Sequence, residues 1–516
     1  MAKLSKNQTI WIATLAGLAI FAMLELAGTI LTDGVIVYPL DDPYIHLAMA
    51  EQMVAGGYGV NPGEFASADS SILFPVLLMP FVGTGFHAYL PLLYNALGLG
   101  LSLMFLAKLV LESGLAERPR IVLLFLLAAP IALNFQGLAL LGMEHALHLA
   151  TVLMALLGLT RWLKSGGLNG LLVLAILLGP LLRYEALGLS LVLSLAIFLS
   201  GHKKAGAGLA FGAVLPLVAF GFWLKSLGLS ALPNSVLAKA SFVGPDENAM
   251  WVLVSHNFGA HGNLPYALSF VMAAVGLFAM AVWKWPDRRI RILALTAAAV
   301  ALGHAMLGKF GWSNRYEIYA LTYVSLSVLV LLSHARFFSL GLGGALLAGF
   351  ALYGHFLLLN AVNGPANIYN QQWQMGRLAR AWDGPVLAGD IGLVSYGNPN
   401  KVVDLYGLAS TQALAARRGP APAGWPNQMA EAESAGMAMV YDGWLAKHLL
   451  PGWTRVAFLD LRVPVTILST RVSIYATSPE MVAPVRALLE PFSNTLPRYA
   501  ILEMTGDDTP ETKEGR

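Results

Sequence analysis

The 516-residue sequence contains no cysteine and few charged residues. The absence of cysteine excludes disulfide bonds, cysteine nucleophiles and thiolate metal ligands. Charged residues make up 12% of the chain, against about 25% in ordinary soluble domains, and hydrophobic residues reach 57%. This composition excludes both a mainly soluble enzyme and a disordered chain. The formal net charge of +3 provides no strong basic field, so we expect no nucleic-acid partner.

Long apolar runs dominate the first 360 residues. A helix that crosses a bilayer needs about 20 apolar residues. The stretch 168–200 is long enough for a hairpin broken near Arg183, and with nine single stretches it predicts eleven crossings. The segment 72–86 is broken by Pro75, Pro80 and Gly83, so we expect it to be re-entrant or interfacial. The nine single stretches lie near residues 10–31, 88–112, 120–136, 143–162, 206–227, 264–283, 290–307, 316–333 and 336–360.

The distribution of lysine and arginine predicts the orientation. One set of helix ends carries fourteen of these residues and the opposite set carries five. Basic residues in short loops favour the cytoplasmic side. With eleven crossings, the N-terminus is expected to be cytoplasmic and the C-terminus to lie outside.

The chain is expected to divide into three parts. Residues 1–360 form a transmembrane module with outer loops 32–71 and 228–263. Residues 361–504 form a small α/β domain on the outer face, and residues 505–516 form a disordered tail. Residues 361–516 contain 13 Lys+Arg and 14 Asp+Glu, as in a soluble protein. Short β-rich runs at 385–389, 400–405, 437–441, 454–459 and 463–476 alternate with helical stretches such as 366–382 and 479–491.

Two adjacent carboxylates follow the first span. Asp42 precedes Pro43, and aspartate before a proline at the first helical position predicts that Asp42 caps a helix over 43–55. No capping role is predicted for Asp41. The helix dipole favours its ionised form, which makes it a candidate general base. His46 lies one turn further on. It could help the carboxylates to hold an acceptor or a divalent cation, or it could be an ordinary interfacial histidine.

Buried charges on the outer side form a second group. Arg183 lies in an apolar stretch, where a charge usually faces a cavity or a partner. Glu185 is two residues away and could form a structural pair with Arg183, but residues at this spacing do not face each other on a helix. Glu144 could instead be a partner for Arg183. Arg315 follows Ser313 and Asn314, and an arginine near a helix N-terminus is either an anion site or a snorkelling anchor.

Lys239 lies in the second outer loop, and Lys309 reads as an anchor at a span end. Together these residues suggest an outer cavity with a base on one side and cations on another. A lipid phosphate would suit the cations, and its sugar would suit the carboxylates. A transporter or flippase for a lipid-linked sugar could show the same pattern.

The remaining candidates are less specific. Tyr44, Trp312 and Tyr316 are interfacial aromatics that could also stack on a sugar. Asp390 and Asp404 in the tail could bind an acceptor or could be turn residues. Walker, Rossmann, HExxH and GxSxG patterns are absent. No cofactor is assigned, and a divalent cation remains open.

Several ordered motifs between residues 38 and 410 resemble the GT-C superfamily of polyprenyl-phosphate-dependent membrane glycosyltransferases. Within it, the nearest likeness is to the mycobacterial terminal arabinofuranosyltransferases and their bacterial relatives. The motifs are DDPYIHLAMAEQMVAGGYGVNPGE, LLGMEHALHLA, LLRYEALGL, LPNSVLAKAS, SNRYEIYAL and GDIGLVSYGNPNKVVDLYGLAS. Two positions depart from the family pattern: Tyr184 stands where proline is expected, and SADSSILFP replaces a Thr/Ser-Pro-Leu pattern.

The resemblance implies many transmembrane helices with a soluble outer domain, in the inner membrane of a bacterium. It implies transfer of a sugar, arabinofuranose by likeness, from a polyprenyl phosphate to a glycan, lipid or protein of the cell envelope. Asp41 would be the catalytic carboxylate with Asp42 beside it. The donor phosphate would be bound by Arg315, Arg183 and Lys239. The substrate-binding candidates are His46, Tyr44, Glu144, Glu185, Asn234, Trp312 and Tyr316.

Overall fold

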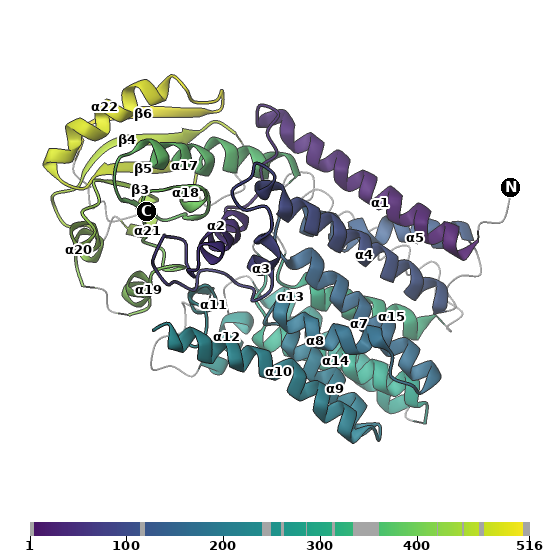
Figure 1. Ribbon diagram of the computed structural model, residues 1–516. Coiled ribbons are helices and arrows are strands. Elements are labelled where there is room, and N and C mark those ends of the chain that lie inside the picture. The colour runs from purple at the N-terminus through teal and green to yellow at the C-terminus, as the bar shows by residue number, and fades with distance from the viewer. Residues whose placement is uncertain are drawn as a thin grey trace.

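The computed structural model combines an α-helical module with a C-terminal α/β domain (Figure 1). The start of helix α1 and the α/β domain lie at opposite ends of the helical module (Figure 1). The structure describes residues 5–113, 119–239, 249–259, 263–284, 286–311, 315–333, 361–419, 422–445, 448–463 and 469–508.

Within these residues, six helices are long and apolar enough to cross a membrane: α1 (Lys6–Gly28), α4 (Leu90–Glu112), α7 (His145–Ser165), α10 (Lys203–Ser226), α13 (Leu264–Trp283) and α14 (Arg288–Leu307). Four shorter apolar helices are α5 (Pro119–Ala132), α8 (Gly170–Leu182), α9 (Ala186–Leu199) and α15 (Ile318–Leu332). The chain is therefore a multi-pass membrane protein. These ten helices match ten of the eleven expected crossings, and the eleventh, 336–360, lies outside the described residues. The break at Arg183 is confirmed, because it separates α8 from α9.

The connections on the side of the α/β domain contain short helices. The segment 72–86 holds the five-residue helix α3 (Phe74–Leu78), followed by η2 (His87–Tyr89), and forms no spanning helix. The second outer loop holds α11 (Asn234–Lys239) and α12 (Ala249–Phe258). Helix α6 (Phe135–Leu140) links α5 to α7.

Helix α2 (Asp42–Val54) follows the first span, as expected, but its N-terminus differs from the prediction. Asp41 is the N-cap residue and Asp42 is the first helical residue, with Pro43 in the first turn. The Asp41 side chain makes no capping hydrogen bond within α2. The prediction that Asp42 caps this helix was wrong because both carboxylates are drawn to partners elsewhere in the fold, described below.

The α/β domain is built on a six-stranded sheet with the order β2-β1-β3-β5-β4-β6. Strand β1 is parallel to β2 and β3, and the remaining pairs are antiparallel. All five expected β-rich runs contain a strand. The strands are β1 (Val386–Ala388), β2 (Val402–Asp404), β3 (Met437–Val440), β4 (Thr454–Leu461), β5 (Arg471–Ala476) and β6 (Ala500–Asp508). The helices are α17 (Gln372–Ala381), α18 (Gly392–Ser395), α19 (Thr411–Arg418), α20 (Trp425–Ala432), α21 (Asp442–Leu445) and α22 (Val482–Ser493).

Strand β6 corrects the expected start of the disordered tail. It continues to Asp508, so the prediction of disorder was wrong for 505–508. This polar segment is ordered by its neighbour: β6 pairs with β4 up to Asp508, which lies opposite Arg455. The Thr505 hydroxyl also donates to the Arg455 carbonyl at 2.6 Å.

Helix α2 belongs to the hydrophobic core of the α/β domain. Its buried side chains Ile45, Ala48 and Met49 form one cluster with residues of the sheet, including Val386 and Met439. Full burial of a side chain the size of isoleucine or methionine contributes about 1.5–3 kcal/mol. The first outer loop is therefore fixed to the α/β domain, and the two adjacent aspartates lie where that domain meets the membrane module.

Candidate active site

Asp41 is held by the backbone of the α/β domain. Its two carboxylate oxygens accept hydrogen bonds from the amides of Gly392, at 2.6 Å, and Leu393, at 2.9 Å. These amides begin helix α18. A Cβ atom built on Gly392 would lie 2.7 Å from the Asp41 Cγ, so only glycine permits this approach. The contact joins residues about 350 positions apart in the sequence and fixes the plane of the carboxylate.

A second carboxylate, Asp390, lies close to Asp41. Asp390 follows strand β1 and accepts hydrogen bonds from Gln372 Nε2, at 2.8 Å, and from the Tyr441 hydroxyl, at 2.9 Å. Burial and the negative charge of Asp390 raise the pKa of Asp41, although the two amides act in the opposite direction. Burial also raises the pKa of Asp390. A carboxyl with a raised pKa holds a proton more readily than a solvated aspartate does.

Asp42 turns the opposite way, toward the membrane module. Its carboxylate lies 3.4 Å from Nη1 of Arg315, just before α15. The Arg315 Nη2 donates to the Tyr316 hydroxyl at 3.1 Å. The Arg315 side chain is only 2% exposed, and its buried Nε makes no hydrogen bond with any residue that the structure describes. Lys309 approaches the same tyrosine, with its Nζ 5.3 Å from the ring centroid.

These groups line one cavity of about 340 Å³. Carboxylates from the first outer loop and the α/β domain lie on one wall, and cations from the membrane module lie on the other. An aromatic pair from the α/β domain, Tyr406 and Trp444, also lines it, with ring centroids 4.8 Å apart. The lining residues are Asp41, Asp42, Ile45, Ala238, His256, Lys309, Arg315, Tyr316, Gly389, Asp390, Ile391, Tyr406, Leu408 and Trp444.

A smaller cavity of about 180 Å³ adjoins the first, and the two share His256, Lys309 and Tyr316 as lining residues. The smaller cavity reaches into the membrane module and is lined partly by Val236, Leu253 and Leu307. A ligand with a polar head and an apolar chain would therefore find both environments side by side.

Arg183 lines this smaller cavity within a buried ionic network. Glu144, the candidate partner from the sequence, pairs with Arg183, with Oε1 2.7 Å from the Arg183 Nη1. The expectation that Glu185 would not face Arg183 was wrong, because Glu185 pairs with Nη2 and Nε at 2.5 and 3.1 Å. The helix rule does not apply here. Arg183 is extended, at φ −147° and ψ 130°, and Glu185 precedes the next helix.

Other predicted residues lie outside the two cavities. His46 is 2% exposed, with Nε2 3.5 Å from the Glu144 carboxylate and its ring edge-on to Phe74. Asn234 is buried and donates to the Thr411 hydroxyl at 3.2 Å, which joins α11 to α19. Tyr44 lines a different cavity, described below.

Asp404, Lys239 and Trp312 are the remaining candidates from the sequence. Asp404 is buried and accepts four backbone hydrogen bonds from residues 406–410, so it stabilises a turn. Lys239 ends helix α11, but its side chain, like the whole of Trp312, lies outside the described part of the chain.

Among the aromatic and charged residues that line the larger cavity, the sequence did not single out His256, Tyr406 or Trp444. Lys309 was interpreted as an anchor, although its position six residues before Arg315 was a usable signal. The two aromatics of the α/β domain carried no such signal, because only the folded sheet brings them to Asp41.

The described residues contain no group of three or more His, Asp or Glu side chains placed to hold a metal ion. The carboxylates of the cavity are instead engaged by backbone amides, by Arg315, and by Gln372 with Tyr441.

Comparison with known proteins gives a partial match in sequence and distant matches in structure. Residues 366–475 match a family described as a domain of unknown function, DUF8728. No curated protein matches the chain in sequence.

Among solved structures, the chain is similar to the apo oligosaccharyltransferase of Archaeoglobus fulgidus, with 13% identity, a TM-score of 0.45, and coverage of 90% of this chain and 74% of that chain. It is also similar to ArnT from Cupriavidus metallidurans bound to undecaprenyl phosphate, with 12% identity, a TM-score of 0.46, and coverage of 91% and 98%. These values describe a distant likeness of chain path.

Proposed function

We propose that this protein is a membrane glycosyltransferase of the GT-C superfamily that transfers a sugar from a polyprenyl phosphate to a hydroxyl group of a cell-envelope acceptor. One observation carries the proposal. A single cavity at the junction of the two modules has carboxylates on one wall and Arg315 with Lys309 on the other. This arrangement suits a substrate whose anionic phosphate and neutral sugar must be bound side by side.

The cationic wall would bind and stabilise the leaving group. In the reaction, the acceptor oxygen forms a bond to the anomeric carbon, and the bond from that carbon to the phosphate oxygen breaks. Negative charge then develops on the polyprenyl phosphate. Arg315 and Lys309 would stabilise this charge in a site with little water, where such groups act most strongly. The Arg315 Nε, buried without a partner among the described residues, is a donor for a phosphate oxygen.

Asp41 would accept the proton of the attacking hydroxyl. Each of its oxygens accepts one amide hydrogen bond and keeps a lone pair for this proton. The amides orient the carboxylate, and its raised pKa makes it a stronger base than a solvated aspartate. Asp42 would act on the other wall by orienting Arg315.

The adjoining smaller cavity would accommodate the first part of the polyprenyl chain against Val236, Leu253 and Leu307. Arg183 is already paired with two carboxylates, so we assign it an indirect part in phosphate binding. Its Cζ lies 5.8 Å from the ring centroid of Tyr316, on which Arg315 and Lys309 also converge. The phosphate contact predicted for Lys239 stays part of the proposal.

We place the enzyme in the inner membrane of a bacterium, with the N-terminus cytoplasmic and the α/β domain outside. The excess of basic residues at one set of helix ends supports this orientation. So does the position of the α/β domain at the end of the module opposite the start of α1. Arabinofuranose is the donor sugar to test first, on the basis of the sequence motifs.

The test is a transfer assay with purified full-length protein. Radiolabelled polyprenyl-phosphate arabinofuranose and mannose would be incubated with a cell-envelope acceptor extract. We expect label in the acceptor fraction, and its loss in Asp41→Asn. The matched control is Asp383→Asn, an exposed aspartate that follows α17. Undiminished transfer in Asp41→Asn would remove that residue from the mechanism. Movement of labelled lipid between leaflets of proteoliposomes without transfer would favour a flippase.

A further inference from the structure

A third cavity, of about 410 Å³, lies on the other side of the Asp41–α18 contact. Tyr44 and Leu393 line it, whereas Ile45, next to Tyr44, and Ile391, two residues before Leu393, line the site described above. The first turns of α2 and α18 therefore form the wall between the two cavities. Nothing in the reaction proposed above uses the third cavity.

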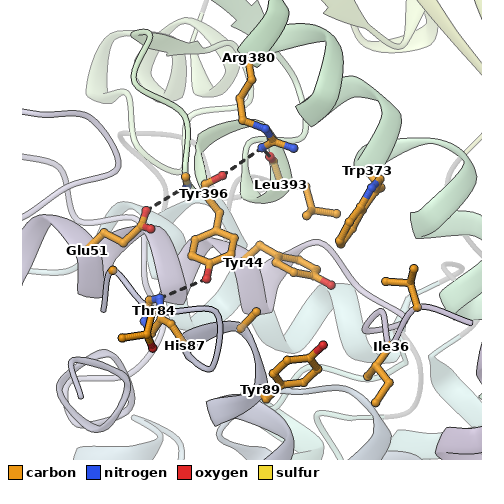
Figure 2. A pocket seen from close by; sticks show the side chains of 14 residues that line it. Ile36, Tyr44, Glu51, Thr84, His87, Tyr89, Trp373, Arg380, Leu393 and Tyr396 are labelled. Carbon is orange, nitrogen blue, oxygen red and sulfur yellow. Dashed lines mark hydrogen bonds between the residues drawn. The ribbon is translucent and has the colours of Figure 1, made fainter. Parts of the chain in front are cut away.

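Four aromatic side chains surround this cavity: Tyr44, Tyr89, Trp373 and Tyr396 (Figure 2). They come from four separate elements, namely α2, η2, α17 and the residue that ends α18. The rings of Tyr44 and Tyr396 are tilted, with centroids 6.2 Å apart. Aromatic rings contributed by distant parts of the chain form an apolar surface on which the apolar face of a ligand can pack.

Two charged side chains on the cavity wall, Arg380 and Glu51, each use only some of their polar atoms in hydrogen bonds to the protein backbone (Figure 2). Arg380 uses Nη1 to donate to the carbonyls of Leu393 and Tyr396, at 3.3 and 3.1 Å. Its Nη2 and Nε make no hydrogen bond with the residues that the structure describes. Glu51 uses Oε2 to accept from the Gly397 amide at 3.0 Å, which leaves Oε1 as an acceptor. The wall therefore offers a fixed donor and a fixed acceptor.

The ring of Tyr396 is also fixed in place. His87 Nε2 lies 2.9 Å from the carbonyl oxygen of Leu78, which can only accept, so Nε2 carries the proton. In the neutral ring, Nδ1 then accepts from the Tyr396 hydroxyl at 3.2 Å. Such support pre-organises the cavity, and a pre-organised cavity loses less entropy when a ligand binds.

We propose that this cavity is a carbohydrate-binding subsite for a neutral sugar unit of the acceptor. The C–H face of a sugar ring packs on aromatic rings, and its hydroxyls both donate and accept, which matches Glu51 and Arg380. The charge of Glu51 balances that of Arg380, so the wall has no net positive charge that would favour an anionic ligand such as a lipid phosphate. Assigning the sugar to the acceptor rests on the proposed function, whereas sugar binding itself does not.

The first test measures binding without catalysis. Isothermal titration calorimetry on the detergent-solubilised full chain would use octyl arabinofuranosyl and octyl mannosyl disaccharides as probes. Trp373→Ala is expected to weaken binding about tenfold, which corresponds to the loss of one aromatic contact. Trp373→Phe should retain most of the affinity. The matched control is Trp283→Ala, because Trp283 is 77% exposed at the end of α13.

The second test is kinetic and connects the subsite to transfer. Trp373→Ala should raise the acceptor KM about tenfold, with kcat and the donor KM within twofold of the unmodified protein. Equal disaccharide affinity in Trp373→Ala and the unmodified protein, or no binding by either, would overturn the proposal. A third outcome would also overturn it: neither disaccharide binds, but the protein binds anionic phospholipid vesicles and Trp373→Ala abolishes that binding.

The two proposals can fail separately. Disaccharide binding that Trp373→Ala weakens, with no transfer by the unmodified protein from any donor, would support the subsite and contradict the proposed function. Conversely, suppose that transfer depends on Asp41 while Trp373→Ala changes neither the acceptor KM nor disaccharide binding. This result would support the proposed function and contradict the subsite.

Discussion

The contact between Asp41 and Gly392 offers a sharp test of the proposed base. A Cβ added by Gly392→Ala would lie closest to the carbonyl oxygen of Asp41, 2.7 Å from the Asp41 Cγ and 2.8 Å from its Oδ1. An ordinary contact needs at least 3.4 Å, and the closest clash is with a backbone atom, so the Asp41 backbone and its carboxylate must both shift by more than about 0.7 Å, or α18 must retreat. A displacement of about 1 Å in a catalytic group can lower the rate about a hundredfold.

We therefore expect Gly392→Ala to lower kcat about a hundredfold in the polyprenyl-phosphate transfer assay while the donor KM changes little. The control is Gly506→Ala, since a Cβ at that glycine would meet no atom within 4 Å. A double-mutant cycle with Asp41→Asn adds the second measurement. If both changes act through the same carboxylate, the double variant should be no slower than Asp41→Asn. Unchanged kcat in Gly392→Ala, or fully additive losses, would refute the reasoning.

Three further predictions concern charges in and near the cavity. Because Asp41 acts as a base only when ionised, activity should fall as pH drops through its raised pKa, which lies above the ordinary value of about 3.9. Asp390→Asn removes a negative neighbour and should move this acid limb of the kcat profile to lower pH; an unmoved limb would contradict the coupling. Arg315→Gln should lower kcat about 10²–10³-fold, with Arg315→Lys intermediate, and wild-type kcat in the glutamine variant would exclude Arg315 from charge stabilisation. Glu144→Gln leaves Arg183 with one carboxylate and should lower the free energy of unfolding by about 3 kcal/mol in a thermal assay. The control Glu112→Gln breaks an exposed pair with Arg161 and should lower it by about 0.5 kcal/mol or less.

The features that the sequence predicted correctly depend on local patterns. Apolar runs define the spans because a bilayer imposes their length. The break at Arg183 was visible because a charge interrupts such a run. The five β-rich runs were recognisable from composition, since each strand lies in the core of the sheet and is rich in apolar residues.

The features that the sequence could not predict depend on contacts between distant segments. The amides that hold Asp41 come from Gly392 and Leu393, and no local rule relates them to the first loop. Strand β6 has a polar sequence at its end and is ordered by pairing with β4. The Arg183–Glu185 pair escaped prediction because a helical rule was applied to a junction that is not helical.

The adjacency of Asp41 and Asp42 has a structural consequence beyond their chemistry. Adjacent Cα atoms are about 3.8 Å apart, so the two carboxylates are bound to a common rigid segment. Asp41 is bonded to the amides of the α/β domain, and Asp42 pairs with Arg315 of the membrane module. Through the Asp42–Arg315 pair, the dipeptide therefore connects the two walls of the cavity and restricts the distance between base and cation. Because α2 is anchored in the core of the α/β domain, a shift of that domain relative to the membrane helices must either carry Asp41 away from Arg315 or break one of these contacts. The geometry of the site is thus a property of the junction between the two modules, which neither module could supply alone.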